Sequence, residues 1–173
     1  ARKTRRDVVS RKGAALELPL LARQFGRRGL LAHGNSLQSS GTLDRILSAA
    51  PDDMSVRAWR HSGGEPSVDA VDALRAALKA DPPDWVAAVG GGSVIDLAKA
   101  AAGLADAPEK TAYYQRHQKE VTASEIPLVA APSTAGTGSE ATPVSVLTDP
   151  DRVLKQSIRH NSHIPRLVIL DPD

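Results

Sequence analysis

The sequence predicts an α/β protein with a doubly wound, mainly parallel β-sheet. Three observations lead to this fold class. Short apolar segments alternate along the 173 residues with segments whose apolar residues recur at helical spacing. The segment 85–89 (WVAAV) is apolar on both faces, as is usual for a strand inside a parallel sheet. A glycine-rich turn then leads directly into the next predicted helix.

The first half of the chain contains two strand candidates, each followed by a helix candidate. Residues 29–33 (GLLAH) predict a short buried strand, and 42–50 predict a helix after it. Residues 55–61 predict the second strand, which ends at a G-G-E-P turn. The segment 67–80 has an apolar stripe at helical spacing opposite Asp and Lys, and two prolines end it.

The second half repeats this alternation and then becomes rich in strands. The third strand, 85–89, is followed by a helix at 93–104, and 107–125 is polar and predicts a loop with some helix. The remaining strand candidates are 126–131, 143–148, 153–158 and 166–170. The second and third of these predict a hairpin around D-P-D.

Composition excludes several classes of protein. Hydrophobic residues make up 41% and charged residues 24%, as in soluble globular domains. The absence of cysteine excludes disulfides, thiolate zinc sites and a cysteine nucleophile. No apolar run approaches the roughly 18 residues of a membrane span, and no signal-peptide core follows the basic start. We therefore expect a soluble, cytoplasmic protein without a membrane partner.

Positive charge is concentrated at the beginning of the chain. Residues 1–12 carry six basic residues and one acidic residue, so we assign them to a basic leader or edge segment. The segment has no interleaved aromatics and no nucleic-acid-binding motif, and we expect no nucleic-acid partner. The alternative, DNA binding through 1–12, predicts a steeply salt-dependent affinity that is lost when this segment is deleted.

The glycines at 90–92 stand where a buried strand becomes a helix. Amides at a helix start have no intrahelical acceptor, and the helix dipole favours negative charge there. Because glycines remove the Cβ atoms, a pyrophosphate can approach Gly91, Gly92 and Ser93, and the Ser93 hydroxyl can cap the helix or bind phosphate. This is not the G-x-G-x-x-G fingerprint, because its third glycine position falls on Ile95.

A second glycine-rich loop, 131–143 (APSTAGTGSEATP), follows the fourth strand. Its hydroxyl groups belong to Ser133, Thr134, Thr137, Ser139 and Thr142. Ligands of parallel sheets bind beyond the carboxyl ends of the strands. The two loops are therefore expected to face one crevice and to hold the two parts of a dinucleotide.

Both loops resemble motifs of a known family. GGGSVIDLAK (90–99) resembles the G-G-G-S-x-x-D-x-x-K signature of the iron-dependent (group III) alcohol dehydrogenases. PSTAGTGSEAT is similar to a second segment of that family, and the tail PRLVILDPD and the turn G-E-P-S are similar to two more. The resemblance extends over 13–173 and implies that these residues form a Rossmann-like dinucleotide-binding domain. It also implies that the C-terminal helical metal domain of the family is absent from this chain.

The resemblance assigns cofactor contacts to specific positions. It implies that the amides of Gly91, Gly92 and Ser93 bind the pyrophosphate and that Asp96 lies near the nicotinamide half. Further cofactor contacts are implied for Ser133, Thr134, Thr137, Thr142 and Lys155. A lysine is suited to this role because it binds ribose hydroxyls or phosphate.

The end of the first predicted strand differs from NAD-preferring relatives. Those relatives often carry an acid there, which accepts a hydrogen bond from the adenosine ribose. This chain has Gly34 at that position, followed by Asn35 and Ser36. An acid would repel a 2′-phosphate, whereas these residues leave room for one. We therefore expect NADP in preference to NAD.

The metal ligands of the family, an aspartate and three histidines, lie downstream of the D-P strand. We therefore expect divalent iron or zinc only in the missing C-terminal half, and neither a metal site nor a catalytic residue in this chain. His160 and His163 form an H-x-x-H without a nearby carboxylate, and we do not interpret them as ligands.

Together these features predict the cofactor-binding part of a metal-dependent oxidoreductase. It would transfer a hydride between an alcohol or aldehyde and NAD(P), and the chain alone would be inactive. The family suggests a homo-oligomer, a dimer or larger. Two alternatives remain open: a relative of glycerol or glycerol-phosphate dehydrogenases, and a nucleotide-binding module that does not catalyse.

Overall fold

A computed structural model describes residues 6–118, 124–133, 144–149, 154–159 and 164–172. Its main sheet has six strands in the order β1-β8-β5-β4-β2-β3, and every neighbouring pair is parallel. The strands are β1 (Asp7–Ser10), β2 (Arg28–His33), β3 (Ser55–Arg60), β4 (Trp85–Gly90), β5 (Leu128–Pro132) and β8 (Leu167–Leu170). The predicted parallel α/β fold is confirmed.

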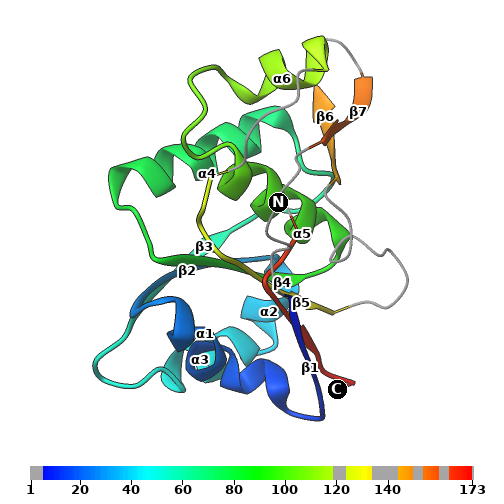
Figure 1. Ribbon diagram of the computed structural model, residues 1–173. Helices are drawn as coiled ribbons and strands as arrows, with labels where there is room; N and C mark the ends of the chain where they lie inside the picture. The colour runs from blue at the N-terminus through cyan, green and yellow to red at the C-terminus, as the bar shows by residue number, and fades with distance from the viewer. Residues whose placement is uncertain (1–5, 119–123, 134–143, 150–153, 160–163, 173) are drawn as a thin grey trace.

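Helices cover both faces of this sheet. Figure 1 shows α4 and α5 above it and α1, α2 and α3 below it. The upper helices are α4 (Val68–Ala80), α5 (Gly92–Gly103) and α6 (Thr111–His117), of which α6 packs on α4. The lower helices are α1 (Leu18–Ala22), α2 (Asn35–Ser39) and α3 (Thr42–Ser48), with 3-10 turns at Ala14–Glu17 and Arg23–Phe25.

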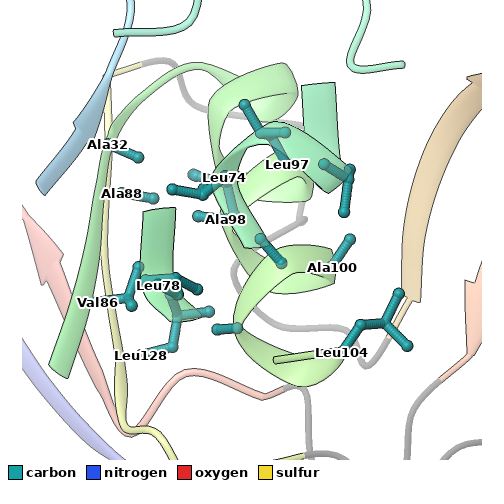
Figure 2. Close-up of a cluster of buried hydrophobic side chains, with 14 of the residues drawn as sticks. Ala32, Leu74, Leu78, Val86, Ala88, Leu97, Ala98, Ala100, Leu104 and Leu128 are labelled. Atoms are coloured by element: carbon teal, nitrogen blue, oxygen red, sulfur yellow. The ribbon is translucent and has the colours of Figure 1, made fainter. Parts of the chain in front are cut away.

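Two hydrophobic cores follow from the alternation of side chains along the strands. Leu30, Ala32, Val86 and Ala88 point toward α4 and α5, whereas the intervening residues pack in the lower core. Figure 2 shows the upper core, where small residues of α5 such as Ala98 face the sheet and Leu74 of α4. The small side chains allow the helix to approach the strands closely, and this fixes the position of the first turn of α5.

A separate hairpin is attached to the upper layer. It consists of β6 (Val144–Asp149) and β7 (Leu154–Arg159), paired antiparallel as predicted. β6 packs against α5, and Gln115 of α6 donates a hydrogen bond of 2.7 Å to the carbonyl of Leu147. Arg116 pairs at 2.7 Å with the buried carboxylate of Asp149. These contacts explain why α6 forms in a stretch whose sequence lacks a helical period.

Most element boundaries agree with the prediction within a few residues. The strand expected from 126 begins at Leu128, after Pro127. Within the basic segment, Asp7–Ser10 forms the edge strand of the sheet beside β8. In the part of the chain that the structure describes, no helix has the length and apolarity needed to cross a bilayer.

Asp81 joins the amino ends of β2 and β3 to the end of α4. Its carboxylate accepts hydrogen bonds from Arg28 and Arg57, the latter at 2.7 Å. The hydrogen bond from Arg28 is the main cause that lowers the pKa of Asp81 from its ordinary value of 3.8; desolvation opposes it, and the charges of Arg28 and Arg57 add to the lowering. The folded state therefore gains stability from this group above pH 3.8 and loses it as the pH falls through the lower folded pKa.

We expect Asp81→Asn to lower the thermal midpoint slightly at pH 7, because the pair is exposed and screened by water. The gap from the wild type should narrow as the pH falls below about 4, where the wild-type carboxylate also becomes protonated. Thermal melts at a series of pH values measure this difference. A gap that is independent of pH would contradict the assigned role of the charge.

A candidate dinucleotide-binding site

The candidate site lies where β2 and β4 end side by side. The chain leaves β2 toward α2 below the sheet and leaves β4 toward α5 above it (Figure 1). Such a reversal opens a crevice at the carboxyl edge of a parallel sheet. His33 pairs with Val89 in the ladder, so the next residues, Gly34 and Gly90, lie side by side at the carboxyl edge.

The first two glycines at the end of β4 have different physical roles. Gly90 has a φ of 151°, and a Cβ there would lie 3.2 Å from a methyl group of Val94, so the turn itself requires glycine. Gly91 has φ −78° and ψ −175°, an extended conformation that any residue adopts. The backbone conformation therefore gives no reason for glycine at position 91.

The first turn of α5 presents its amides to this crevice. Gly91 is the N-cap and has no side chain to cap the helix, and the first intrahelical bond runs from Ile95 N to Gly91 O at 3.2 Å. Within the described residues, no side chain caps this turn. The amides of Gly92 and Ser93 are therefore donors without intrahelical acceptors at the positive end of a 12-residue helix.

Ser93 lies inside the first turn of α5 because the helix begins at Gly92, one residue earlier than expected. It is therefore not the cap that the sequence allowed, but its amide belongs to the donor set. These uncapped amides, next to glycines that leave them uncovered, fit the diphosphate of a dinucleotide.

Gly34 borders the same crevice. It is the N-cap of α2, with φ −96° and ψ −177°, and a Cβ there would lie 3.6 Å from the Val94 methyl group. Val94 therefore lies between Gly34 and Gly90, which places the first strand end against the first turn of α5. A side chain at position 34 would have ordinary van der Waals space at the mouth of the crevice.

Asn35 and Ser36 lie at the start of α2, and both are exposed. The Asn35 amide donates a hydrogen bond of 3.1 Å to the carbonyl of Ser62, in the loop after β3. The backbone amide of His61 donates to the carbonyl of His33 at 2.8 Å. The loops after β2 and β3 are thus joined at the carboxyl edge.

Sequence reasoning did not predict the role of two buried histidines here. The ring of His33 bonds to the carbonyl of Gly34 at 2.9 Å, and that of His61 to the carbonyl of Gly64 at 3.1 Å. A carbonyl only accepts, so the ring nitrogen facing it carries the proton. Both side chains are buried and hold the turns beside the crevice. The signal in the sequence is a histidine at or just after the end of a strand, with a glycine one or two residues later.

The second glycine-rich loop begins beside the first. The amide of Ser133 donates to the carbonyl of Gly90 at 2.9 Å, so the ends of β4 and β5 are in direct contact. Asp96 lies half-buried on α5, and Lys99 follows it with no exposed surface. Three predicted contacts, Thr134, Thr137 and Thr142, lie outside the described residues. Lys155 pairs with Thr148 in the hairpin, and its side chain is also outside the described part.

No metal site is found in the described ranges, which contain no group of three or more His, Cys, Asp or Glu that could hold an ion. His160 and His163 lie outside these ranges. A large open depression of about 780 Å³ lies between α4 and residues 105–110. Because Pro82 and Ile126, which precede β4 and β5, also line it, this depression is at the opposite edge of the sheet and is not the crevice.

A doubly wound sheet whose point of reversal carries a helix start without a side-chain cap among the described residues is typical of dinucleotide-binding α/β proteins. The family model for iron-containing alcohol dehydrogenases matches residues 5–172. The chain belongs to the iron-containing alcohol dehydrogenase family. This confirms the resemblance inferred from the two glycine-rich motifs.

Individual relatives agree with this assignment. An alcohol dehydrogenase from Thermococcus barophilus is 33% identical over 172 residues, which cover 95% of this chain and 45% of that protein. The NADPH-dependent butanol dehydrogenase of Clostridium saccharobutylicum is 30% identical over 174 residues, which cover 97% of this chain and 44% of that protein.

A solved structure of a sulfoacetaldehyde reductase from Bifidobacterium kashiwanohense, in complex with NAD+, superposes with a TM-score of 0.90 at 31% identity. The match covers 99% of this chain and 46% of that one. The chain thus spans less than half the length of each of these three proteins.

Proposed function

We propose that the chain binds the cofactor of an NAD(P)-dependent alcohol dehydrogenase. The observation that carries this proposal is the uncapped first turn of α5, which begins at the end of β4 beside Gly34. Relatives named for alcohol and aldehyde substrates support the reaction class. The proposed substrate is therefore a small alcohol or aldehyde.

Each part of the crevice would hold a different part of the dinucleotide. The amides of Gly91, Gly92 and Ser93 would donate to the pyrophosphate, and the loop that begins at Ser133 would bind the nicotinamide half together with Asp96. Contacts from Thr134, Thr137, Thr142 and Lys155 belong to the same proposal, on the basis of the family motif.

The bound nicotinamide would supply the hydride chemistry, and the contribution of this chain would be to orient the ring and to exclude water from it. The buried residues behind the crevice support that role. Val89 and Val94 are nearly fully buried, so the floor of the site is apolar and fixed. A cofactor that is held rigidly in place reduces the loss of entropy on reaching the transition state.

We further propose NADP as the preferred cofactor. Gly34 offers no carboxylate at the crevice, whereas Asn35 and Ser36 offer hydrogen-bond donors on an exposed helix start. A 2′-phosphate is therefore not repelled at this point. The relatives include an NADPH-dependent enzyme and a structure with NAD+, so both cofactors occur among similar proteins.

The described residues contain no group of side chains that could hold the iron implied by the family name. We therefore derive no catalytic step that uses iron. We propose that the metal, iron or zinc, is held by residues outside this chain. We also propose that the natural protein is a dimer or a larger homo-oligomer.

Titration of the natural full-length protein with NADPH and NADH, followed by nicotinamide fluorescence, tests the proposal. We expect both to bind, NADPH more tightly, and turnover with short primary alcohols after addition of iron(II) or zinc. Absence of binding would contradict the site. Binding without turnover on any alcohol or aldehyde would favour a nucleotide-binding module that does not catalyse. Turnover restricted to glycerol or glycerol phosphate would favour a relative of the glycerol or glycerol-phosphate dehydrogenases.

A further inference from the structure

Arg60 is an exposed cation at the carboxyl edge of the sheet. It is the last residue of β3, beside the end of β2. Most other arginines near strand ends are neutralised: Arg57 pairs with Asp81, and Arg11, which follows β1, pairs with Glu17. Within the described residues, no carboxylate lies within ion-pair distance of Arg60.

The register of the ladder places Arg60 next to the start of α2. Arg60 pairs with His33, and Trp59 pairs with Ala32. Trp59 and Ala32 pack in the upper core, so alternation directs Arg60 and His33 to the lower face, where α2 begins. Gly34 follows His33 directly, and Asn35 contacts the loop after Arg60 through Ser62. Arg60 therefore borders the position at which the adenosine ribose is proposed to lie.

We propose that Arg60 binds the 2′-phosphate of NADP and so determines cofactor preference. This inference rests on the proposed function of the crevice. A guanidinium donates two parallel hydrogen bonds to a phosphate, but a neutral ribose hydroxyl offers it no charge to bind. Arg60 would supply the attraction that Gly34 alone does not, since glycine only removes a repulsion.

The charged groups around Arg60 are compatible with this role. The amide of Asn35 and the hydroxyl of Ser36 are neutral, and His33 donates its Nδ1 proton to the carbonyl of Gly34. The carboxylate nearest in sequence, Glu65, accepts a hydrogen bond from Thr148 of the hairpin at 3.2 Å. No described acid therefore competes with a phosphate for the guanidinium.

The test is Arg60→Gln in the natural full-length protein, with dissociation constants for NADPH and NADH measured by fluorescence titration. We expect the constant for NADPH to rise about 10- to 100-fold, because a charged hydrogen-bonded contact is lost. The constant for NADH should change by less than about twofold. Adenosine 2′,5′-bisphosphate should lose affinity to a similar degree as NADPH, and AMP should not.

Arg45→Gln is the matched control. Arg45 is exposed on α3, has no ion pair in the described part of the chain, and its substitution changes the net charge equally. It should leave both constants unchanged, and both variants should retain the wild-type thermal midpoint.

Equal weakening of NADPH and NADH by Arg60→Gln, or no change in either, would overturn the inference while leaving dinucleotide binding intact. Failure of the wild type to bind either nucleotide would instead contradict the proposed function. The two failures are therefore distinguishable.

Discussion

Gly91→Val is expected to weaken binding of NADPH and NADH by at least about 100-fold, which corresponds to roughly 3 kcal/mol. Gly91 is the N-cap of α5, and the side chain of an N-cap residue lies over the amides of the first turn. A valine would cover the donors proposed for the pyrophosphate and would offer no hydrogen bond in return. Isothermal titration with both nucleotides measures the loss.

The fold should tolerate this change. The backbone of Gly91 is extended, with φ −78° and ψ −175°, and β-branched residues adopt this conformation readily. Gly90→Ala is the contrasting variant, since its φ of 151° and a Cβ contact of 3.2 Å with Val94 require glycine. It should lose about 1–3 kcal/mol of stability. Wild-type nucleotide affinity in Gly91→Val would refute the proposed pyrophosphate site.

Gly34→Asp should reverse the cofactor preference. The Cβ of a residue at 34 has ordinary space, 3.6 Å from Val94, and φ −96° suits any residue. An aspartate would accept a hydrogen bond from the ribose of NADH and would repel the 2′-phosphate of NADPH. We expect the ratio of kcat/KM for NADPH to that for NADH to fall about 100-fold or more.

Gly34→Asn separates charge from shape. Asparagine has nearly the same size as aspartate, and both residues are good N-caps, so both variants affect α2 similarly. The asparagine variant should change the ratio of the two kcat/KM values far less than the aspartate variant. If both variants act alike, or if the aspartate variant still prefers NADPH, then position 34 does not determine the preference through its charge.

Local patterns in the sequence were sufficient where an element is long or strongly patterned. The 67–80 stripe predicted α4, and its apolar positions Val71 and Leu74 are fully buried. The apolar segment at 85–89 predicted β4 as a strand covered on both faces, because only a parallel interior strand is apolar throughout. Short elements were missed: α1 and α2 have five residues each, and helices of this length are stable only through tertiary contacts.

Some residues of the candidate site could likewise be predicted from the sequence, and others could not. The sequence predicted Gly91, Gly92 and Ser93 because glycine and serine at the end of a strand leave backbone donors accessible. It predicted Gly34 because this residue stands where an acid would repel a 2′-phosphate. It did not distinguish Gly90, required by its own φ, from Gly91, whose backbone any residue adopts. It also gave no role to His33 and His61, because their partners are carbonyls in loops.

The sequence by itself determined that the protein is a parallel α/β domain with a glycine-rich turn between a buried strand and a helix, since periodicity and glycine placement are local properties of the chain. Only the tertiary structure decided which strand ends are neighbours. Strand order joins β2 to β4, and register aligns His33 with both Val89 and Arg60. These relations depend on contacts between residues 27 to 56 positions apart, which no local pattern records.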